Sequence, residues 1–106
     1  MSHPLSFLAA TTVLCLLTAL PAQANRALAE KSNCLGCHAL DTRMVGPAFR
    51  EVGTRYAGQP DALAQLTASI RQGGSGRWGE MAMPAQADLR EADARRLADW
   101  ILKGAR

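Results

Sequence analysis

The sequence is poor in the residues that contact nucleic acids. Aromatic side chains make up 5% of the 106 residues, as two Trp, one Tyr and two Phe. The formal net charge is only +3, and acidic residues are interspersed with basic ones. Because bases stack on aromatic rings and phosphates need a concentrated basic face, this composition argues against a nucleic-acid partner.

Strand patterns are also nearly absent. No run alternates β-branched with polar residues, and no hairpin dipeptide separates two such runs. Helical patterns are frequent, and they predict helices over residues 27–38, 48–56, 60–74 and 88–104. The sequence therefore predicts an all-α fold of about four helices.

The last two expected helices carry their own end signals. In 60–74 an apolar stripe precedes Gly73 and Gly74, which stand where a helix C-cap is expected. In 88–104, Asp88 and Glu91 have the spacing of a capping box, and Gly104 marks the stop. The glycine-rich segment between these helices has no regular pattern, and it is expected to be a long functional loop.

Charge is missing from the first 24 residues. An apolar run ends at Ala22-Gln23-Ala24, the small-x-small pattern of a signal-peptidase site. A short membrane anchor is the alternative, but the run is short for a bilayer span and the site favours removal. We expect residues 1–24 to be a cleaved signal peptide and residues 25–106 to be one periplasmic domain, without stable membrane insertion.

Few metal-binding side chains remain after that cleavage. The mature chain keeps Cys34, Cys37 and His38, because Cys15 and His3 leave with the signal peptide. About 82 residues, 106 minus 24, bury a thin core that usually needs a disulfide, metal or cofactor. A disulfide between Cys34 and Cys37 would close a tiny loop and constrain the unfolded chain little. A larger group is expected to fill the core.

The Cys34-Leu35-Gly36-Cys37-His38 motif has four possible chemistries. A thioredoxin-like dithiol would sit beside a βαβ unit, and a structural zinc site would need a fourth Cys or His; neither is present. Copper would recruit a Met, but adjacent Cys37 and His38 point in different directions. The fourth is c-type haem attachment, for which Cys-x-x-Cys-His is the signature. On a helix these residues share a face, so both thiols can bond the porphyrin while His38 reaches the iron. We expect one covalent haem c.

The residue pattern by itself does not identify the sixth ligand of the haem iron. Candidates are a Met, a Lys, the N-terminal amine or none. Met44 is too close to His38 in sequence to reach the opposite face, whereas Met81 and Met83 lie in the long loop. In an extended segment these two project to the same side, so periodicity does not choose between them.

With these features the chain resembles the small bacterial class I cytochromes c of the c-551 type. The matching segments are "CLGCHALDTRMVGPAF", "IRQGGSGRWGEMAMP" and "LADWILKG". The resemblance implies a class I cytochrome c fold around one haem, with His38 and Met83 as axial ligands. It also implies that the Pro47 carbonyl bonds the His38 ring and that Trp78 contacts a haem propionate. Arg71 and Arg77 are further candidates for the propionates.

The chain departs from that family at three positions. Ser69 stands where similar members carry an arginine at the propionates, Asn33 replaces a glycine, and Ala29 replaces an aromatic residue.

The expected function is that of a periplasmic one-electron carrier rather than an enzyme. Electrons would pass at an apolar haem edge that includes Met44 and Val45, flanked by Lys31, Arg43 and Arg50, and the chain is expected to be monomeric. The resemblance suggests nitrite reductase, an oxidase or a membrane cytochrome complex as redox partner. A haem-based sensor or a peroxidase-like protein with a labile sixth site is the alternative.

Overall fold

The computed structural model describes residues 1–2 and 21–106. It contains helices α1 (Pro21–Lys31), α2 (Phe49–Tyr56), α3 (Ala62–Gln72) and α4 (Glu91–Leu102), with a short 3₁₀ turn η1 (Cys34–Gly36) after α1. In this part of the chain there is no strand, only an isolated bridge between Gly74 and Met83. The all-α prediction with about four helices is confirmed.

Most of the predicted signal peptide lies outside the described residues. Its expected cleavage point, before Asn25, falls within α1 of the full-length chain. Between residues 21 and 106 no helix is both long and apolar enough to cross a membrane.

The predicted helix over 27–38 is wrong in its second half. Helix α1 ends at Lys31, and Asn33 takes a left-handed conformation with φ 61° before the Cys34–Gly36 turn. Asn is one of the few residues other than Gly that adopt this conformation at low cost. The chain therefore changes direction just before the first cysteine of the motif.

Helix α3 follows its sequence pattern closely. Ala62, Leu66 and Ile70 are buried along one face. Gly73 ends the helix with φ 69°, as its sequence position predicted. The chain can then turn sharply into the long loop.

Helix α4 is apolar on its inner face but starts differently from the prediction. The capping box of Asp88 and Glu91 is not formed, because the helix begins only at Glu91 and Asp88 lies in the preceding turn. The N-cap is Arg90, without a side-chain cap hydrogen bond. Glu91 and Asp93 in the first turn interact favourably with the helix dipole instead.

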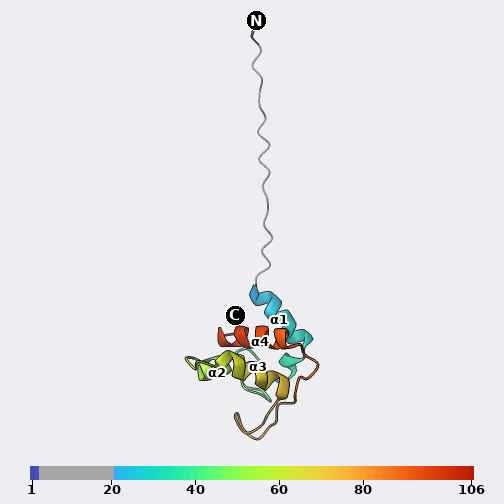
Figure 1. The fold of residues 1–106 in the computed structure, drawn as a ribbon, viewed down its shortest axis with the longest axis vertical. Helices are drawn as coiled ribbons and strands as arrows, with labels where there is room; N and C mark the ends of the chain where they lie inside the picture. The colour runs from blue at the N-terminus through green and yellow to red at the C-terminus, as the bar shows by residue number, and fades with distance from the viewer. Residues whose placement is uncertain (3–20) are drawn as a thin grey trace.

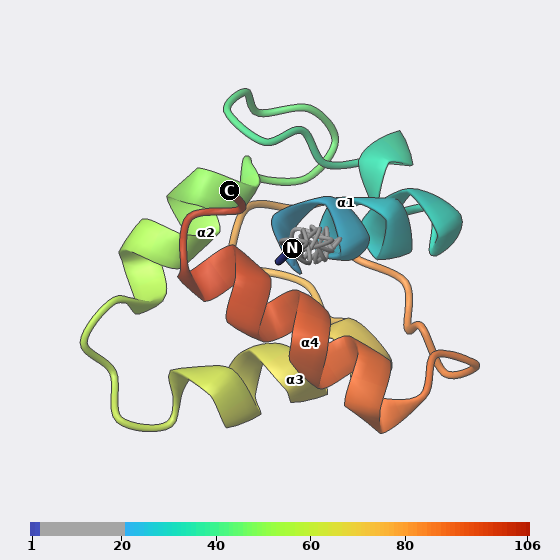
Figure 2. The same ribbon diagram turned by 90° about the horizontal axis from the view of Figure 1, so that it is seen from above.

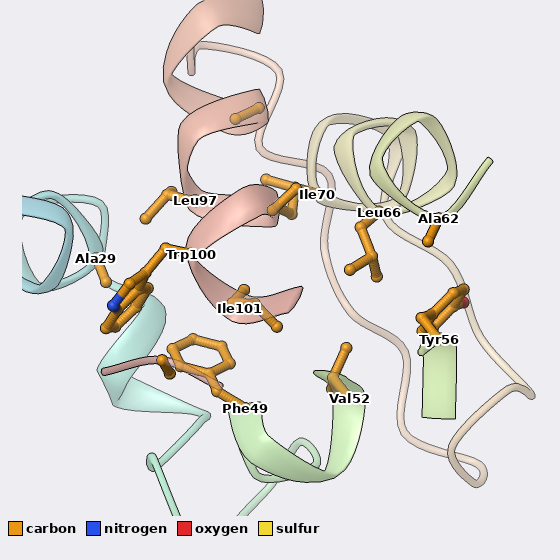
Figure 3. Close-up of a cluster of buried hydrophobic side chains, with 13 residues drawn as sticks. Ala29, Phe49, Val52, Tyr56, Ala62, Leu66, Ile70, Leu97, Trp100 and Ile101 are labelled. Atoms are coloured by element: carbon orange, nitrogen blue, oxygen red, sulfur yellow. The ribbon is translucent and has the colours of Figure 1, made fainter. Parts of the chain in front are cut away.

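Helix α4 is the centre of the packing. It contacts α1, α2 and α3, and Figure 2 shows it crossing over α3 beside α1. The core joins residues of all four helices, several of which point toward α4 in Figure 3. Helices α2 and α4 approach so closely that a Cβ on Gly53 would lie 2.5 Å from the Ile101 carbonyl oxygen. The segment from α3 to α4 loops out on the side away from α1 (Figure 1).

Candidate functional site

A deep apolar cavity opens between the residues after η1 and the long loop. Its lining is mostly apolar with a few polar groups, as in cofactor sites. Cys37, His38 and Pro47 line the cavity from the segment after η1, and Met83 lines it together with other residues of segment 73–84. The floor is apolar and is formed by core residues Phe49, Val52, Tyr56, Leu66, Ile70 and Ile101.

The Cys-x-x-Cys-His segment forms a compact turn at the edge of this cavity. The amides of Cys37 and His38 both donate to the Cys34 carbonyl oxygen, at 3.2 and 3.0 Å. Both cysteines are free; Cys34 is half-buried against the core and Cys37 is exposed. Burial raises the pKa of the Cys34 thiol, partly opposed by a backbone hydrogen bond, so the thiol is favoured over the thiolate.

The His38 ring is held on three sides. Its Nδ1 lies 2.7 Å from the carbonyl oxygen of buried Pro47. A carbonyl only accepts, so Nδ1 carries the proton and the neutral ring keeps its lone pair on Nε2. Phe49 stacks on the ring with centroids 5.0 Å apart, and a Cβ on Gly46 would lie 2.5 Å from its Cε1. The free ligand atom of His38 is therefore Nε2.

The other lining segment, residues 73–84, is attached to the end of α3. Gly74 and Met83 form an isolated β-bridge with two backbone hydrogen bonds, and the amide of Gln86 donates to the Ile70 carbonyl oxygen at 3.1 Å. The structure distinguishes Met81 from Met83, which the spacing of the residues in the sequence did not. Met83 is half-buried and packs against the core, whereas Met81 lies at the cavity rim with 69% of its surface exposed.

Trp78 lies at the same cavity, on a segment held by two arginines. Arg43 donates to the Trp78 carbonyl oxygen. Arg55 lies over the indole with its Cζ 4.3 Å from the ring centroid, and it donates to the Arg77 carbonyl oxygen at 2.6 Å. Sequence reasoning missed Arg55, because nothing in the pattern of α2 relates it to a loop more than twenty residues later. It also missed the ring-supporting roles of Gly46 and Phe49.

The expected ring of cations around the mouth is partly neutralised. Arg50 pairs with Asp41, and Arg43 lies 3.4 Å from Glu51. Both arginines therefore steer a partner less strongly than unpaired cations would.

The donor set of the cavity fits haem c. His38 and Met83 both line the cavity, Cys37 lines it too, Cys34 lies in the same turn, and the lining is mainly apolar. Over the described residues no cluster of three or more His, Cys, Asp or Glu side chains offers a metal site without such a group.

Sequence comparison agrees with this geometry. A family model described as "Cytochrome C oxidase, cbb3-type, subunit III" matches residues 21–101. Cytochrome c-552 of Nitrosomonas europaea is 46% identical over 87 residues, covering 82% of this chain and 84% of the relative. Cytochrome c-551 of Azotobacter vinelandii is 45% identical over 75 residues, covering 71% and 90%. The chain belongs to the small cytochromes c of the c-551/c-552 type.

Solved structures agree with the family. The crystal structure of wild-type Nitrosomonas europaea cytochrome c552 matches with a TM-score of 0.72 and 44% identity, covering 74% of this chain and 96% of that one. A class 1 cytochrome from Sideroxydans lithotrophicus matches with a TM-score of 0.67 at 26% identity, covering 83% and 100%. The expected class I fold is confirmed. Members of this family are electron-carrier proteins with one covalent haem c, and haem c is the cofactor of this cytochrome.

Proposed function

We propose that this cytochrome is a periplasmic one-electron carrier in which Cys34 and Cys37 bind the haem covalently and His38 and Met83 are the axial ligands. The observation that carries the proposal is that His38 and Met83, each held by a backbone contact, line the same cavity. His38 presents Nε2 from the wall where Pro47 holds Nδ1, and Met83 lies on the wall bridged to Gly74.

Haem c supplies a one-electron iron couple, and His/Met ligation raises its potential. The chain contributes orientation and exclusion of water. The Pro47 carbonyl fixes the His38 tautomer and makes the ring a better donor toward iron. The apolar floor favours the less charged, reduced state of the centre. With both axial positions filled by side chains, no site remains for a substrate, so we propose a carrier rather than an enzyme.

Electron exchange is proposed at the mouth of the cavity. The exposed large apolar residues Met44, Val45 and Met81 have 51%, 52% and 69% of their surfaces accessible, and Val45 and Met81 line the cavity. A small apolar contact of this kind suits a transient redox encounter. A nitrite reductase, an oxidase or a membrane cytochrome complex is the class of partner that we propose.

Export and maturation are part of the same proposal. Cleavage before Asn25 would shorten α1 at its start and leave the fully buried Ala29 in place. The mature chain of residues 25–106 is proposed to be a periplasmic monomer.

The optical spectrum of the purified, dithionite-reduced protein tests the axial ligands. We expect a low-spin c-type spectrum that carbon monoxide does not change. Met83→Ala should make the spectrum respond to the gas and should lower the reduction potential. Met81→Ala is the matched control and should do neither.

Two results would contradict the proposal. A prompt response of the wild type to carbon monoxide would indicate an open sixth site and favour the sensor or peroxidase alternative. A response of Met81→Ala alone would assign the ligand to Met81.

A further inference from the structure

Three arginines lie at residues 77 and 78, at the rim of the cavity. Two of them, Arg43 and Arg55, hold the backbone and the indole of this segment. The third is Arg77 itself, whose side chain reaches α3, where Nη1 donates to Ser69 Oγ at 2.6 Å. Ser69 and Arg77 both line the cavity.

The charges at this end of the cavity are not balanced. Arg43 has Glu51 as a partner, but within residues 21–106 neither Arg55 nor Arg77 lies within 4.0 Å of a carboxylate. Arg71, equally close to the loop in sequence, points elsewhere. Its Nε donates to the Leu89 carbonyl oxygen at 3.2 Å, and its Nη1 lies 4.0 Å from Glu91. Of the two arginines that the sequence offered for the propionates, only Arg77 lies at the cavity.

The polar groups beside Arg77 are hydrogen-bond donors as well. The Ser69 oxygen accepts from Arg77, so its own hydroxyl proton remains available to donate. The indole N–H of Trp78 can only donate. An uncompensated guanidinium, a hydroxyl and an indole at one end of an apolar cavity form a site for a carboxylate.

We propose that Arg77, positioned by Ser69, is the charge partner of a haem propionate, and that Arg55 fixes the loop that carries it. The proposal rests on the haem site proposed above, because the propionates are the anionic groups of that cofactor. Ser69 thus serves as the anchor for a guanidinium that the neighbouring loop supplies.

This contact has a measurable consequence. A nearby cation favours the ionised propionate and lowers its pKa. Ionisation adds negative charge beside the iron and favours the oxidised state, so the reduction potential falls as the pH rises through that pKa. The pH midpoint of this fall therefore reports whether Arg77 lies beside the carboxylate.

Protein-film voltammetry of the holoprotein over a pH series tests the proposal. Arg77→Leu should lower the potential and move the pH midpoint upward by about one unit, the size expected for losing one close opposite charge. Ser69→Ala should move it in the same direction by less, and Arg77→Lys should keep most of the wild-type value. Arg71→Leu removes the same charge from the other side of α3 and should leave the midpoint unchanged.

The other charged groups at this end of the cavity are the same in all these variants. They are Arg43 with Glu51, Arg55 and the exposed Glu80. Equal midpoint shifts in Arg77→Leu and Arg71→Leu would mean only a long-range charge effect and would overturn the proposal, as would an unchanged midpoint in Arg77→Leu. If Arg77→Leu does not yield holoprotein, Ser69→Ala decides, and a wild-type midpoint in that variant counts against the proposal. The carbon monoxide test of Met83 is read separately, so failure of the axial assignment is distinguishable from failure of the propionate contact.

Discussion

Gly74 and Met83 face each other as an isolated antiparallel pair, in which each amide donates to the other's carbonyl oxygen at 3.0 and 2.8 Å. This pair connects the end of α3 to the segment that carries the proposed distal ligand. The neighbouring Gly73 closes the contact from the helix side, because a Cβ there would clash with the Met83 carbonyl and with backbone atoms of Pro84 and Ala85.

Gly73→Ala should therefore displace Met83. The substitution adds a backbone clash to the cost of an alanine at φ 69° and ψ −165°, a region that is essentially restricted to glycine and costs about 1–3 kcal/mol. We expect a lower melting temperature and a reduced protein that binds carbon monoxide. Gly76→Ala is the control, since Gly76 also has a positive φ, of 86°, but open space around its Cβ position. It should lose some stability without binding the gas, and equal gas binding by the two variants would contradict the argument.

Gly46→Ala should disturb the His38 side of the site. A Cβ at this position would lie 2.5 Å from His38 Cε1 and 2.8 Å from Nδ1, so the ring must rotate or shift. We expect weaker axial ligation, seen as a lower yield of holoprotein and an altered reduction potential. Gly36→Ala lies inside the Cys-x-x-Cys-His motif but meets nothing within 4 Å. Its yield and potential should stay near those of the wild type, and a loss as large as that of Gly46→Ala would refute the steric explanation.

Phe49→Ala should cost more stability than any change at the rim. Phe49 is buried, stacks on His38 and meets Trp100 edge-on with centroids 5.7 Å apart. Removing a buried Phe side chain costs about 3–5 kcal/mol in the free energy of unfolding, which denaturant titration measures. Val45→Ala removes an exposed apolar side chain and should change stability by no more than about 0.5 kcal/mol. Comparable losses in the two variants would mean that Phe49 is not part of a packed core.

Ala29→Phe should destabilise the contact between α1 and α4. Ala29 is fully buried beside Trp100 (Figure 3), so a ring there has no space unless the helices separate. Overpacking of this kind costs about 1–3 kcal/mol by thermal or denaturant unfolding. Ala27→Phe, on the exposed face of the same helix, should have little effect. A stabilised Ala29→Phe would show that α1 moves freely enough to accept an aromatic residue.

The sequence predicted the features that depend on local pattern. The apolar stripe of α3 and its stop at Gly73 need only helical periodicity and a glycine. It did not predict the end of α1 at Lys31, because the turn depends on one left-handed Asn33. The capping box of Asp88 failed because the preceding turn, not the residue spacing, decides where α4 begins.

The residues of the site also divide into those that local pattern predicts and those that depend on tertiary contacts. The Cys-x-x-Cys-His spacing alone indicated the cofactor, whereas the choice between Met81 and Met83 required the family resemblance. Their different burial arises from the bridge to Gly74, a contact between distant residues that no periodicity encodes. The directions of Arg71 and Arg77 likewise follow from tertiary partners, Leu89 and Ser69.

Because of the bridge between Gly74 and Met83, the two sides of the site differ in how easily they open. The His38 side rests on buried Pro47 and on Phe49, which belongs to the core, so it cannot move away without disrupting the packing of α2 and α4. The Met83 side is attached to α3 mainly by backbone hydrogen bonds at one edge. Opening such a segment costs less than global unfolding. Exchange of the proposed sixth ligand can thus proceed through a local fluctuation of one loop while the four helices, the proposed thioether links and the histidine stay in place.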